Sequence, residues 1–560
     1  MTRPMETLLD LLDDAVARFG DRPALGIRHE DGTTSTWTYR DLERNSRAAA
    51  FRLRAVGLQP GDRLLTWSPS TPELPATYLG AIRAGIVLVP LDLRMSREAI
   101  EGIVTSSGAA HLVLGTGRDA PDPVEFGLGG FPTSTVDAIG GPPGSEAGAP
   151  LPLDWEAQVA AFPRPGPTDL VELIYTSGTT GTPKGVMLAH DNLLASNQTF
   201  HRIVPPMDHR IVSLLPLSHL LEQAVGLYYA LSVGASVLYV RSRNPRVIFE
   251  ALREHRVTSM VVVPQVLDLF WSAIEREVEK SGRTAIFARL RSIARRLPVP
   301  IRRLIFRRVH AQLGGSFRLF LSAGAFLPPA LQQGWEDLGV TVLQGYGATE
   351  TGTGSCTTLD DHGLGTVGRT PDGIEMRLAP DGEVQFRGPT LFKGYWNAPE
   401  KTAESYTEDG WYRTGDVGHV DRWGRLVLSG RKRDMIVLPN GFNVYPEDIE
   451  NALRIAGLRD TVILETEPGR IEAVLLTPGG PIRQPGETLD FDPAAPPPEV
   501  RATIDAAVKA ANATLGPNQR VAGWRLWHEA DFPRTHTLKI KRDLVRAWAA
   551  ESPAGSGRHR

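Results

Sequence analysis

The first twenty residues carry apolar side chains at the spacing of a helix. The apolar positions are Leu8, Leu9, Leu12, Ala15, Val16 and Phe19. Their recurrence every three to four residues predicts a helix with one buried face. The same stretch contains four acidic residues, which is not typical of a secretory signal peptide. We therefore expect the protein to stay inside the cell, in the cytoplasm.

From Phe51 to about Gly115, helix-like stretches alternate with short apolar runs such as Gly85–Leu91. Such alternation is typical of an α/β fold, in which helices cover a sheet. Apolar periodicity fades over residues 118–167, where glycine and proline are dense. We expect a surface excursion there, ending just before a short buried strand at residues 173–175.

The C-terminal third changes composition abruptly. A strand-like run at 424–430 is followed by the charged cluster Arg431–Asp434 and a second apolar run at 435–438. We expect a large N-terminal domain over residues 1–430 and a small, mobile α+β domain over residues 431–560. A proline-rich stretch at 478–498 interrupts the small domain, and residues 552–560 are expected to form a disordered tail.

Composition and charge exclude several classes of protein. The chain has 560 residues, of which 41% are hydrophobic and 22% charged, as in a globular protein with several folding units. Its net charge of −3 gives no general reason to expect nucleic-acid binding. The single cysteine, Cys356, rules out an internal disulfide and a cysteine-cluster metal site. No apolar run reaches about 18 residues, so any membrane contact is expected to be peripheral.

A loop rich in glycine and hydroxyl residues follows the predicted strand at 173–175. Its candidate phosphate-binding residues are Thr176, Ser177, Gly178, Thr179, Thr180, Gly181, Thr182 and Lys184. The glycines let backbone N–H groups turn inward, and the hydroxyls and the lysine add donors and charge, so the pattern favours a polyphosphate. The spacing differs from G-x-x-x-x-G-K-[ST], which disfavours a Walker-type NTPase. A flexible surface turn is the alternative interpretation.

Several motifs in order resemble the adenylate-forming superfamily, which includes acyl-CoA synthetases, nonribosomal peptide adenylation domains and firefly luciferase. They are the loop at 176–185, Leu215–His219, Ser322–Ala325, Gly345–Glu350 and Tyr412–Asp416. The resemblance extends over most of the chain and is strongest to bacterial long-chain fatty acyl-CoA synthetases. It implies an α/β fold with a multi-subdomain adenylation domain, a small C-terminal domain, and an active site in the cleft between them.

The resemblance assigns two further segments to nucleotide binding. Their candidate residues are Gly324, Ala325, Gln344, Gly345, Tyr346 and Gly347. The glycines permit close approach, and the Tyr346 ring offers a stacking face to a purine. Thr349 is expected at the α-phosphate. Glu350, together with Thr176, is expected at Mg²⁺, which prefers oxygen ligands.

Three further candidates lie around the expected domain boundary. Asp416 is expected in a tight turn with Gly415, where its carboxylate can accept hydrogen bonds from both ribose hydroxyls. By resemblance, Arg431 lies near the ribose and phosphate, and Arg433 is the hinge. The hinge is more often Asp or Lys in the family, but Arg433 retains a charged side chain.

The resemblance also assigns residues to the two chemical steps. Lys539 occupies the place of the catalytic lysine, which suits a reaction that brings a carboxylate and a phosphate together. Leu538 stands where the family most often has glycine. The resemblance associates this departure with the long-chain fatty acyl-CoA synthetase subgroup. Gly441 matches a glycine-centred element that serves thioester formation, and His219 matches a position beside the acyl and thiol channel. A lone histidine is otherwise more often a core residue.

Together these residues predict a ligase that uses ATP and Mg²⁺ to join a long-chain fatty acid to coenzyme A through an acyl-adenylate. Two alternatives are an acyl-AMP ligase that loads a carrier protein and a coenzyme A ligase for another carboxylic acid. A third is a nucleotide-binding module without catalysis. The retained Lys184, Glu350, Asp416 and Lys539 argue against this module.

A basic segment, residues 283–308, alternates arginine with apolar residues and contains no acid. Its arginines are Arg283, Arg289, Arg291, Arg295, Arg296, Arg302, Arg303, Arg307 and Arg308. One interpretation is a helical hairpin on the large domain with solvated arginines. The others are peripheral contact with an anionic membrane, and attraction of coenzyme A phosphates or nucleic acid. The net charge argues against nucleic acid as a main partner.

Overall fold

The computed structural model describes residues 5–117, 119–176, 183–242, 244–440, 442–458, 460–478, 491–534, 540–551 and 557–558. The chain forms two compact units. Unit 1 comprises residues 1–376, 386–412 and 422–426, and unit 2 comprises residues 377–385, 413–421 and 427–560. The expected domain boundary after Gly430 stays a prediction.

Unit 1 contains a six-stranded sheet in the order β6-β5-β3-β4-β7-β8. Its strands are β3 (Arg63–Trp67), β4 (Val87–Pro90), β5 (His111–Leu114), β6 (Thr133–Thr135), β7 (Leu170–Thr176) and β8 (Lys184–Ala189). All neighbours pair in parallel except β7 and β8. Strand β4 is buried along its whole length, as expected for a parallel strand covered on both faces. Strands β4 and β7 confirm the apolar strands predicted near 85–91 and 173–175.

A second sheet of unit 1 has the order β14-β13-β12-β11-β9-β10-β1-β2. Its strands are β1 (Pro23–Arg28), β2 (Thr34–Thr38), β9 (Arg210–Ser213), β10 (Ser236–Val240), β11 (Ser259–Val262), β12 (Leu319–Ser322), β13 (Thr341–Tyr346) and β14 (Ser355–Cys356). The strands from β13 to β1 are parallel, and the two edge strands are antiparallel. The carboxyl ends of β12 and β13 therefore meet at one edge, where ligands of α/β proteins usually bind.

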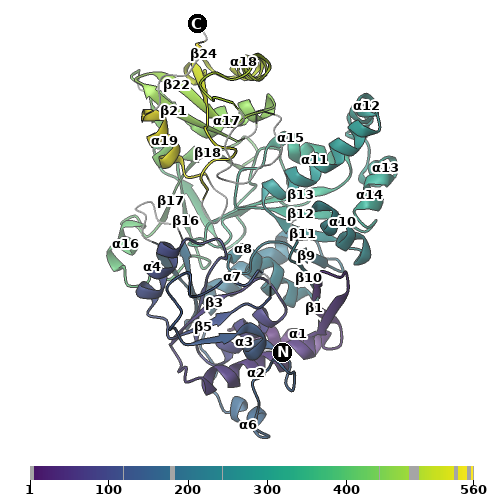
Figure 1. Ribbon diagram of the computed structural model, residues 1–560, viewed down its shortest axis with the longest axis vertical. Coiled ribbons are helices and arrows are strands. Elements are labelled where there is room, and N and C mark those ends of the chain that lie inside the picture. Colours follow the sequence, from purple (N-terminus) through teal and green to yellow (C-terminus); the bar gives the residue numbers. More distant parts are fainter. Residues whose placement is uncertain are drawn as a thin grey trace. The chain divides into compact units, whose positions relative to one another are not determined.

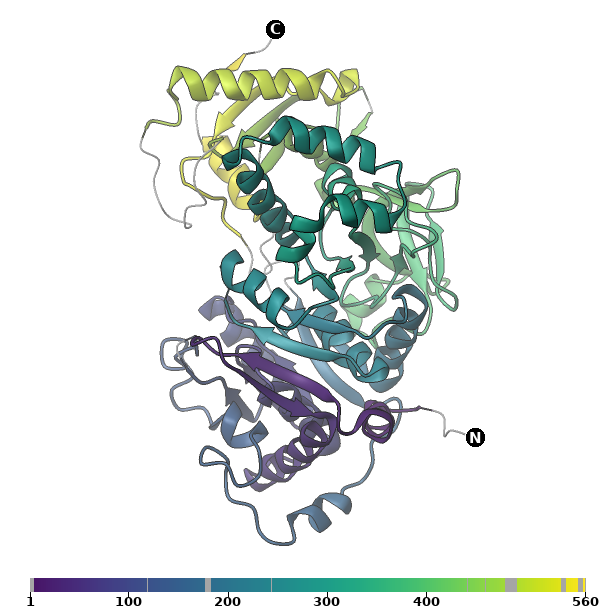
Figure 2. The same ribbon diagram turned by 90° about the vertical axis from the view of Figure 1, so that its right-hand side faces the viewer.

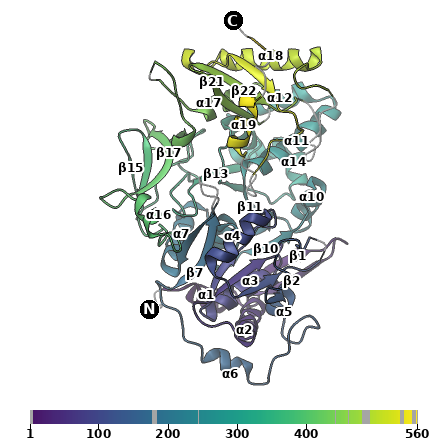
Figure 3. The same cartoon turned by 60° about the vertical axis from the view of Figure 1, so that its left-hand side comes forward.

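Helices accompany both sheets (Figure 1). Their bounds are α2 (Tyr39–Ala55), α3 (Glu73–Arg83), α4 (Arg97–Ser107), α7 (His190–Ile203), α8 (Leu220–Glu222), the π-helical η1 (Gln223–Tyr229), α9 (Ala230–Val233), α10 (Pro245–Glu254), α11 (Pro264–Lys280), α12 (Thr284–Ala294), α13 (Val299–Ile305), α14 (Arg307–Gln312), α15 (Pro329–Asp337) and α16 (Pro399–Glu404). Helices α2 and α3 pack side by side (Figure 3). The basic segment is thus three short helices, α12 to α14, where a hairpin was expected.

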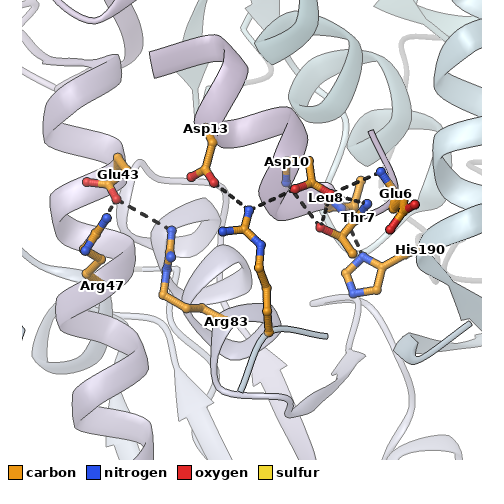
Figure 4. A network of polar contacts seen from close by, with 10 residues as sticks. Glu6, Thr7, Leu8, Asp10, Asp13, Glu43, Arg47, Arg83 and His190 are labelled. Atoms are coloured by element: carbon orange, nitrogen blue, oxygen red, sulfur yellow. Dashed lines mark hydrogen bonds and ion pairs between the residues drawn. The ribbon is translucent and has the colours of Figure 1, made fainter. Parts of the chain in front are cut away.

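The predicted N-terminal helix is confirmed as α1 (Leu8–Phe19). Thr7 and Asp10 form a capping box at its start, and Leu8, Leu11 and Leu12 are buried. Figure 4 shows the polar contacts around this helix. The Leu8 N–H donates to His190 Nδ1, and Arg164 forms ion pairs with Asp10 and Asp13. These contacts fix α1 against segments more than 150 residues away in sequence.

The glycine- and proline-rich stretch at 118–167 differs in part from the expected surface excursion. It contains β6, α5 (Val136–Gly140) and α6 (Trp155–Ala160). The side chains of Val136, Ile139, Trp155 and Val159 are buried in the core of unit 1. Sparse apolar residues therefore anchor the stretch without making a periodic pattern. Helix α6 lies on a long loop (Figures 1 and 3).

Unit 2 is an α+β structure around a sheet of order β21-β22-β23-β24. Its elements are β21 (Thr461–Glu467), β22 (Arg470–Leu475), β23 (Gly523–Leu526), β24 (Gly557–Arg558), α17 (Pro446–Ile455), α18 (Pro498–Asn512) and α19 (Arg542–Glu551). Helix α18 covers one face of this sheet (Figure 2), and Ile504 and Val508 share a buried cluster with Trp524. Strand β24 pairs with β23, although a disordered tail was expected there. The edge of a sheet offers unpaired backbone N–H and C=O groups, with which a short terminal segment can pair. Residues 552–556 and 559–560 lie outside the described residues.

A further sheet has the order β15-β16-β17-β18, formed by β15 (Glu375–Leu378), β16 (Glu383–Arg387), β17 (Tyr412–Val420) and β18 (Leu426–Arg431). The short β19 (Ile436–Val437) and β20 (Asn443–Val444) pair with each other. The whole confirms the expected mixed α/β fold with a large N-terminal and a small C-terminal part. Among the described helices, none is both long and apolar enough to span a bilayer.

Candidate active site

The threonine- and glycine-rich loop connects the antiparallel strands β7 and β8. Strand β7 is buried from Val171 to Tyr175, which fixes where the loop begins. Thr176 and Lys184 face each other in the register of the two strands, so they close the base of the loop. The predicted phosphate-binding residues Ser177, Gly178, Thr179, Thr180, Gly181 and Thr182 lie outside the described residues. Their role stays a prediction.

Lys184 lies over the ring of Tyr395, a residue that the sequence did not single out. The Lys184 Nζ atom is 4.9 Å from the ring centroid, within the range of a cation–π contact. The backbone explains this position, because Val186 forms a β-bridge with Tyr395 and Met187 exchanges hydrogen bonds with the 393–394 segment. The sequence around Tyr395 shows only an aromatic pair after Gly394, which is equally typical of a core strand and so did not indicate a site residue.

Glu350 is tied to the same tyrosine. The Tyr395 hydroxyl donates to Glu350 Oε1 at 3.1 Å, and the Phe392 N–H donates to the Glu350 carbonyl at 2.9 Å. Burial and the neighbouring Glu350 carboxylate raise the pKa of Tyr395 well above its ordinary value, so its hydroxyl stays protonated and can donate. Tyr395 thus connects the two predicted nucleotide motifs, since it contacts both Lys184 and Glu350.

Aromatic rings surround this tyrosine. Phe392, Tyr406 and Tyr412 lie within 6.1 Å of one another, centroid to centroid, and Phe392 is 4.8 Å from Tyr395. Burial raises the pKa of Tyr406 to about 12. The Glu350 carboxylate therefore lies beside a largely apolar aromatic cluster, where a hydrogen bond to it is worth more than in water.

The candidate nucleotide residues follow the carboxyl ends of β12 and β13. Ser322 and Gln344 are opposite each other in the parallel register, so Gly324 and Ala325 leave the sheet beside Gly345 and Tyr346. Gly347 makes a contact that only glycine allows, because a Cβ there would lie 2.0 Å from the Gly352 carbonyl oxygen. This contact folds the segment back on itself and brings Thr349 and Glu350 into the turn at 348–351.

Tyr346 and Gln344 differ in exposure. Tyr346 is half-buried, and its ring centroid is 5.9 Å from that of Phe386. The Gln344 side chain is buried and donates from its amide nitrogen to Gln332 Oε1 at 2.8 Å. The Gln344 backbone is also engaged, since its N–H donates to the Thr357 hydroxyl and its carbonyl accepts from the Thr357 N–H, whereas Tyr346 keeps part of its side chain exposed.

His219 forms a hydrogen bond with Asp92, which the sequence did not single out. His219 Nε2 is 2.9 Å from Asp92 Oδ2, and Asp92 is 1% exposed. Because a carboxylate only accepts, Nε2 carries the proton. Burial opposes the charge on Asp92, but hydrogen bonds from His219 and Arg94 hold its pKa well below the usual range. Asp92 was missed because its partner lies 127 residues away in sequence.

In unit 2, the structure brings Asp416 and Arg431 together. Arg431 Nε is 2.8 Å from Asp416 Oδ1, and both residues lie on strands of one sheet. The expected tight turn at Gly415–Asp416 is wrong, because both residues lie inside β17. Gly415 still adopts a positive φ of 69°, which interrupts the regular strand and explains why its sequence suggests a turn.

The expected hinge residue, Arg433, lies in a 3₁₀ turn at Lys432–Asp434 and is exposed. Its neighbour Lys432 forms an ion pair of 2.5 Å with Asp381. Arg433 has a looser contact, 3.8 Å to Asp434. The hinge role of Arg433 stays a prediction, as does the role of Gly441, which lies outside the described residues.

Lys539 also lies outside the described residues, but the segment around it has a fixed base. Arg534 and Ile540 form an antiparallel bridge, and the Lys541 N–H donates to the Pro533 carbonyl. Arg534 pairs with Asp460 at 2.6 Å, and Arg542 pairs with Glu450 at 2.6 Å. Arg534 and Ile540, the described residues on either side of 535–539, are therefore held next to each other in unit 2.

The oxygen atoms that could bind a metal at this site suit Mg²⁺ that is held mainly by the phosphates of a substrate. No group of three or more His, Cys, Asp or Glu side chains able to hold a metal occurs in the part of the chain that the structure describes. Mg²⁺ at nucleotide sites usually takes one or two protein oxygens and completes its shell with phosphate and water. One carboxylate, Glu350, and one hydroxyl, Thr176, fit that donor set.

Comparison with known proteins identifies the family of this chain. The family model of AMP-binding enzymes matches residues 12–396. A long-chain-fatty-acid–CoA ligase, FadD15 of Mycobacterium tuberculosis, is 30% identical over 555 residues, which cover 92% of this chain and 91% of the relative. A feruloyl-CoA synthase of Amycolatopsis is 30% identical over 447 residues, covering 77% and 80%.

A solved structure shares the fold. It is o-succinylbenzoate CoA synthetase (MenE) from Bacillus subtilis in complex with the acyl-adenylate intermediate OSB-AMP. The TM-score is 0.72 at 20% identity, over 98% of this chain and 99% of that chain. The family model matches more than two thirds of the chain, and one relative is matched over more than nine tenths of both chains. This chain therefore belongs to the AMP-binding enzyme family.

Proposed function

We propose that this enzyme joins a long-chain fatty acid to coenzyme A, using ATP and passing through an acyl-adenylate. The observation that carries the proposal is the contact of Tyr395 with both Lys184 and Glu350, which links the phosphate loop to the expected metal ligand. The ligase activity of the relative matched over 92% of the chain supports the same reaction. The cavity between η1 and the second sheet has a volume of about 20 Å³, which is too small to hold an acyl chain. The acyl chain length in the proposal therefore rests on that relative.

In the first step, a carboxylate oxygen of the acid attacks the α-phosphorus of ATP, and the bond to the diphosphate leaving group breaks. Lys184 and the loop at 176–182 hold the polyphosphate, and Thr349 contacts the α-phosphate. Lys539 offsets the negative charge that grows as the two anions meet. Bound Mg²⁺, held by Glu350 and Thr176, would neutralise part of the polyphosphate charge.

We assign the nucleoside contacts to motif residues that the sequence predicted. Tyr346 stacks on the adenine, with the backbone of residues 324–325 and 344–347 at its edge. Asp416 accepts hydrogen bonds from the ribose hydroxyls, and Arg431, whose Nε is 2.8 Å from Asp416 Oδ1, orients that carboxylate. This arrangement leaves the α-phosphate as the reacting group.

In the second step, the thiol sulfur of coenzyme A attacks the adenylate carbonyl, and AMP leaves with the electron pair of the broken C–O bond. The small domain turns about Arg433, which takes Lys539 away and brings the Gly441 element to the thiol. His219, oriented by Asp92, lies beside the acyl and thiol channel. Positioning and electrostatics carry both steps without a covalent enzyme intermediate.

Two alternatives keep the first step and change a substrate. One passes the acyl group to a carrier protein, and the other accepts a different carboxylic acid, as the feruloyl-CoA synthase does. The proposal also includes a location inside the cell, with peripheral contact to the inner face of the membrane through residues 283–308.

The test is release of AMP and diphosphate with ATP, Mg²⁺ and octanoate, palmitate, oleate or benzoate, each with and without coenzyme A. We expect turnover that depends on coenzyme A and is fastest with the long acids. Adenylate without thioester would support carrier-protein transfer, and fastest turnover of benzoate would support the other acid. No reaction with any acid would contradict the proposed function.

A further inference from the structure

Helices α12, α13 and α14 form one side of unit 1 and face the viewer in Figure 2. Their inner sides account for much of the apolar sequence. Phe287 and Leu290 pack against the core cluster that contains Trp271 and Trp335, and Ala294 and Phe306 are buried in it. A helix packed on a domain needs only this one apolar face.

The same helices carry a second set of apolar side chains that point to solvent. These are Ile286, Ile293, Val299, Ile301 and Leu304, with exposed fractions of 59%, 49%, 45%, 45% and 68%. They are five of the eighteen exposed large apolar residues in the described chain, gathered within nineteen positions. Ile286 and Ile293 are one heptad apart and so share a face of α12. Such a gathering marks an interaction surface.

The nine arginines of this segment divide into two groups. Four have inward partners: Arg291 and Arg295 pair with the buried Asp337, while Arg302 and Arg303 donate to backbone carbonyls such as those of Leu297 and Phe317. The other five, Arg283, Arg289, Arg296, Arg307 and Arg308, are exposed and have no ion pair in the described part of the chain. The first group holds the three helices on unit 1, whereas packing on unit 1 gives no role to the second group.

We infer that these three helices form a docking surface for an anionic lipid bilayer. The five exposed aliphatic side chains enter the boundary between headgroups and acyl chains, and the five outward arginines bind lipid phosphates. Charge complementarity supports this occupant, because residues 281–317 contain no acid. A nucleic acid would use the arginines but would leave the aliphatic side chains in water. The inference deepens the membrane contact that the proposed function includes, and it does not depend on the proposed reaction.

The test is co-sedimentation of the full chain with phosphatidylcholine vesicles, with or without phosphatidylglycerol. We expect binding that requires phosphatidylglycerol and weakens as salt is raised. The double variant Arg289→Gln/Arg308→Gln should lower the partition coefficient roughly thirtyfold, since each cation near the surface is worth about 1 kcal/mol. Its matched control is Arg44→Gln/Arg253→Gln, two exposed arginines on α2 and α10.

A second variant tests the apolar contribution. Ile286→Ser/Leu304→Ser should reduce the binding that persists at high salt, whereas Val124→Ser, at a site that is 67% exposed outside these helices, should not. Unchanged thermal unfolding midpoints would show that the variants fold. Equal binding to both kinds of vesicle, unaltered binding by the variants, or binding to duplex RNA in place of vesicles would each overturn the inference.

Discussion

The Tyr395 hydroxyl donates a 3.1 Å hydrogen bond to Glu350 Oε1, while Lys184 Nζ lies 4.9 Å from the centroid of the same ring. One side chain therefore contacts the predicted phosphate-binding lysine and the predicted metal ligand. Because Tyr395 also bridges to Val186, the position of its ring is set by β8 itself. We regard Tyr395 as a residue that positions the nucleotide site.

Replacing Tyr395 by phenylalanine removes the hydrogen bond and keeps the ring over Lys184. We expect the rate of ATP–diphosphate exchange to fall roughly tenfold or more, since a hydrogen bond to a charged group contributes about 1.5–3 kcal/mol. Tyr406→Phe is the matched control, because Tyr406 belongs to the same aromatic cluster. Equal losses in the two variants would mean that the cluster, and not the bond to Glu350, matters.

Asp416 and Arg431 give a prediction about ATP affinity. Asp416→Asn should raise the KM for ATP roughly tenfold, because a charge-assisted hydrogen bond acceptor becomes neutral. The KM for the acid should change little. A double-mutant cycle with Arg431→Ala measures the coupling of the pair, which we expect to be strong at 2.8 Å. Additive effects would show that Arg431 does not act through Asp416.

Lys539→Ala tests the assigned catalytic lysine. We expect adenylate formation to slow by a factor of roughly 10²–10³, as when a preorganised donor is removed from a transition state. Hydrolysis of supplied acyl-adenylate, or its reaction with coenzyme A, should be much less affected. Lys541→Ala, two residues away, serves as the control. Adenylation near the wild-type rate in Lys539→Ala would refute the assignment.

Two buried acids make the stability of unit 1 depend on pH. Glu172 lies beside Gln223 and Glu222 beside Ser213, and burial raises the pKa of each carboxyl from 4.5 to about 8. Each folded pKa lies above the unfolded value, so the stabilisation is complete below pH 4.5 and is lost as the pH rises to about 8. Each unit of pKa difference corresponds to about 1.4 kcal/mol.

The thermal unfolding midpoint should therefore be lower at pH 8 than at pH 5.5, and Glu222→Gln should flatten this dependence by keeping a neutral side chain of the same shape. Glu156→Gln, at an exposed site, is the control and should leave the profile unchanged. An identical pH profile for the wild type and Glu222→Gln would mean that Glu222 is ionised in the folded protein.

Local patterns predicted the elements that depend on neighbours in sequence. The helix at Leu8–Phe19 and the strands β4 and β7 follow from apolar spacing, because the buried face repeats every few residues. The turn expected at Gly415–Asp416 failed, since a glycine inside a strand can give the same signal as a turn.

Contacts between distant segments could not be predicted in the same way. Asp92 meets His219 across 127 residues, and Tyr395 meets Glu350 across 45. Their positions are set by the order of strands in the sheets, which apolar spacing does not reveal. The resemblance was enough to select the motif residues themselves. Their hydrogen-bond partners could be identified only from the structure.

The measurement that tests the central claim most directly uses palmitate labelled with ¹⁸O in its carboxylate. The enzyme is allowed to turn over with ATP, Mg²⁺ and coenzyme A, and the AMP is analysed by mass spectrometry. Attack of the carboxylate on the α-phosphorus predicts one ¹⁸O atom in each AMP, because the bridging oxygen leaves with AMP when the thiol attacks. Palmitoyl-CoA formed with unlabelled AMP, or with the label in diphosphate, would contradict an acyl-adenylate intermediate.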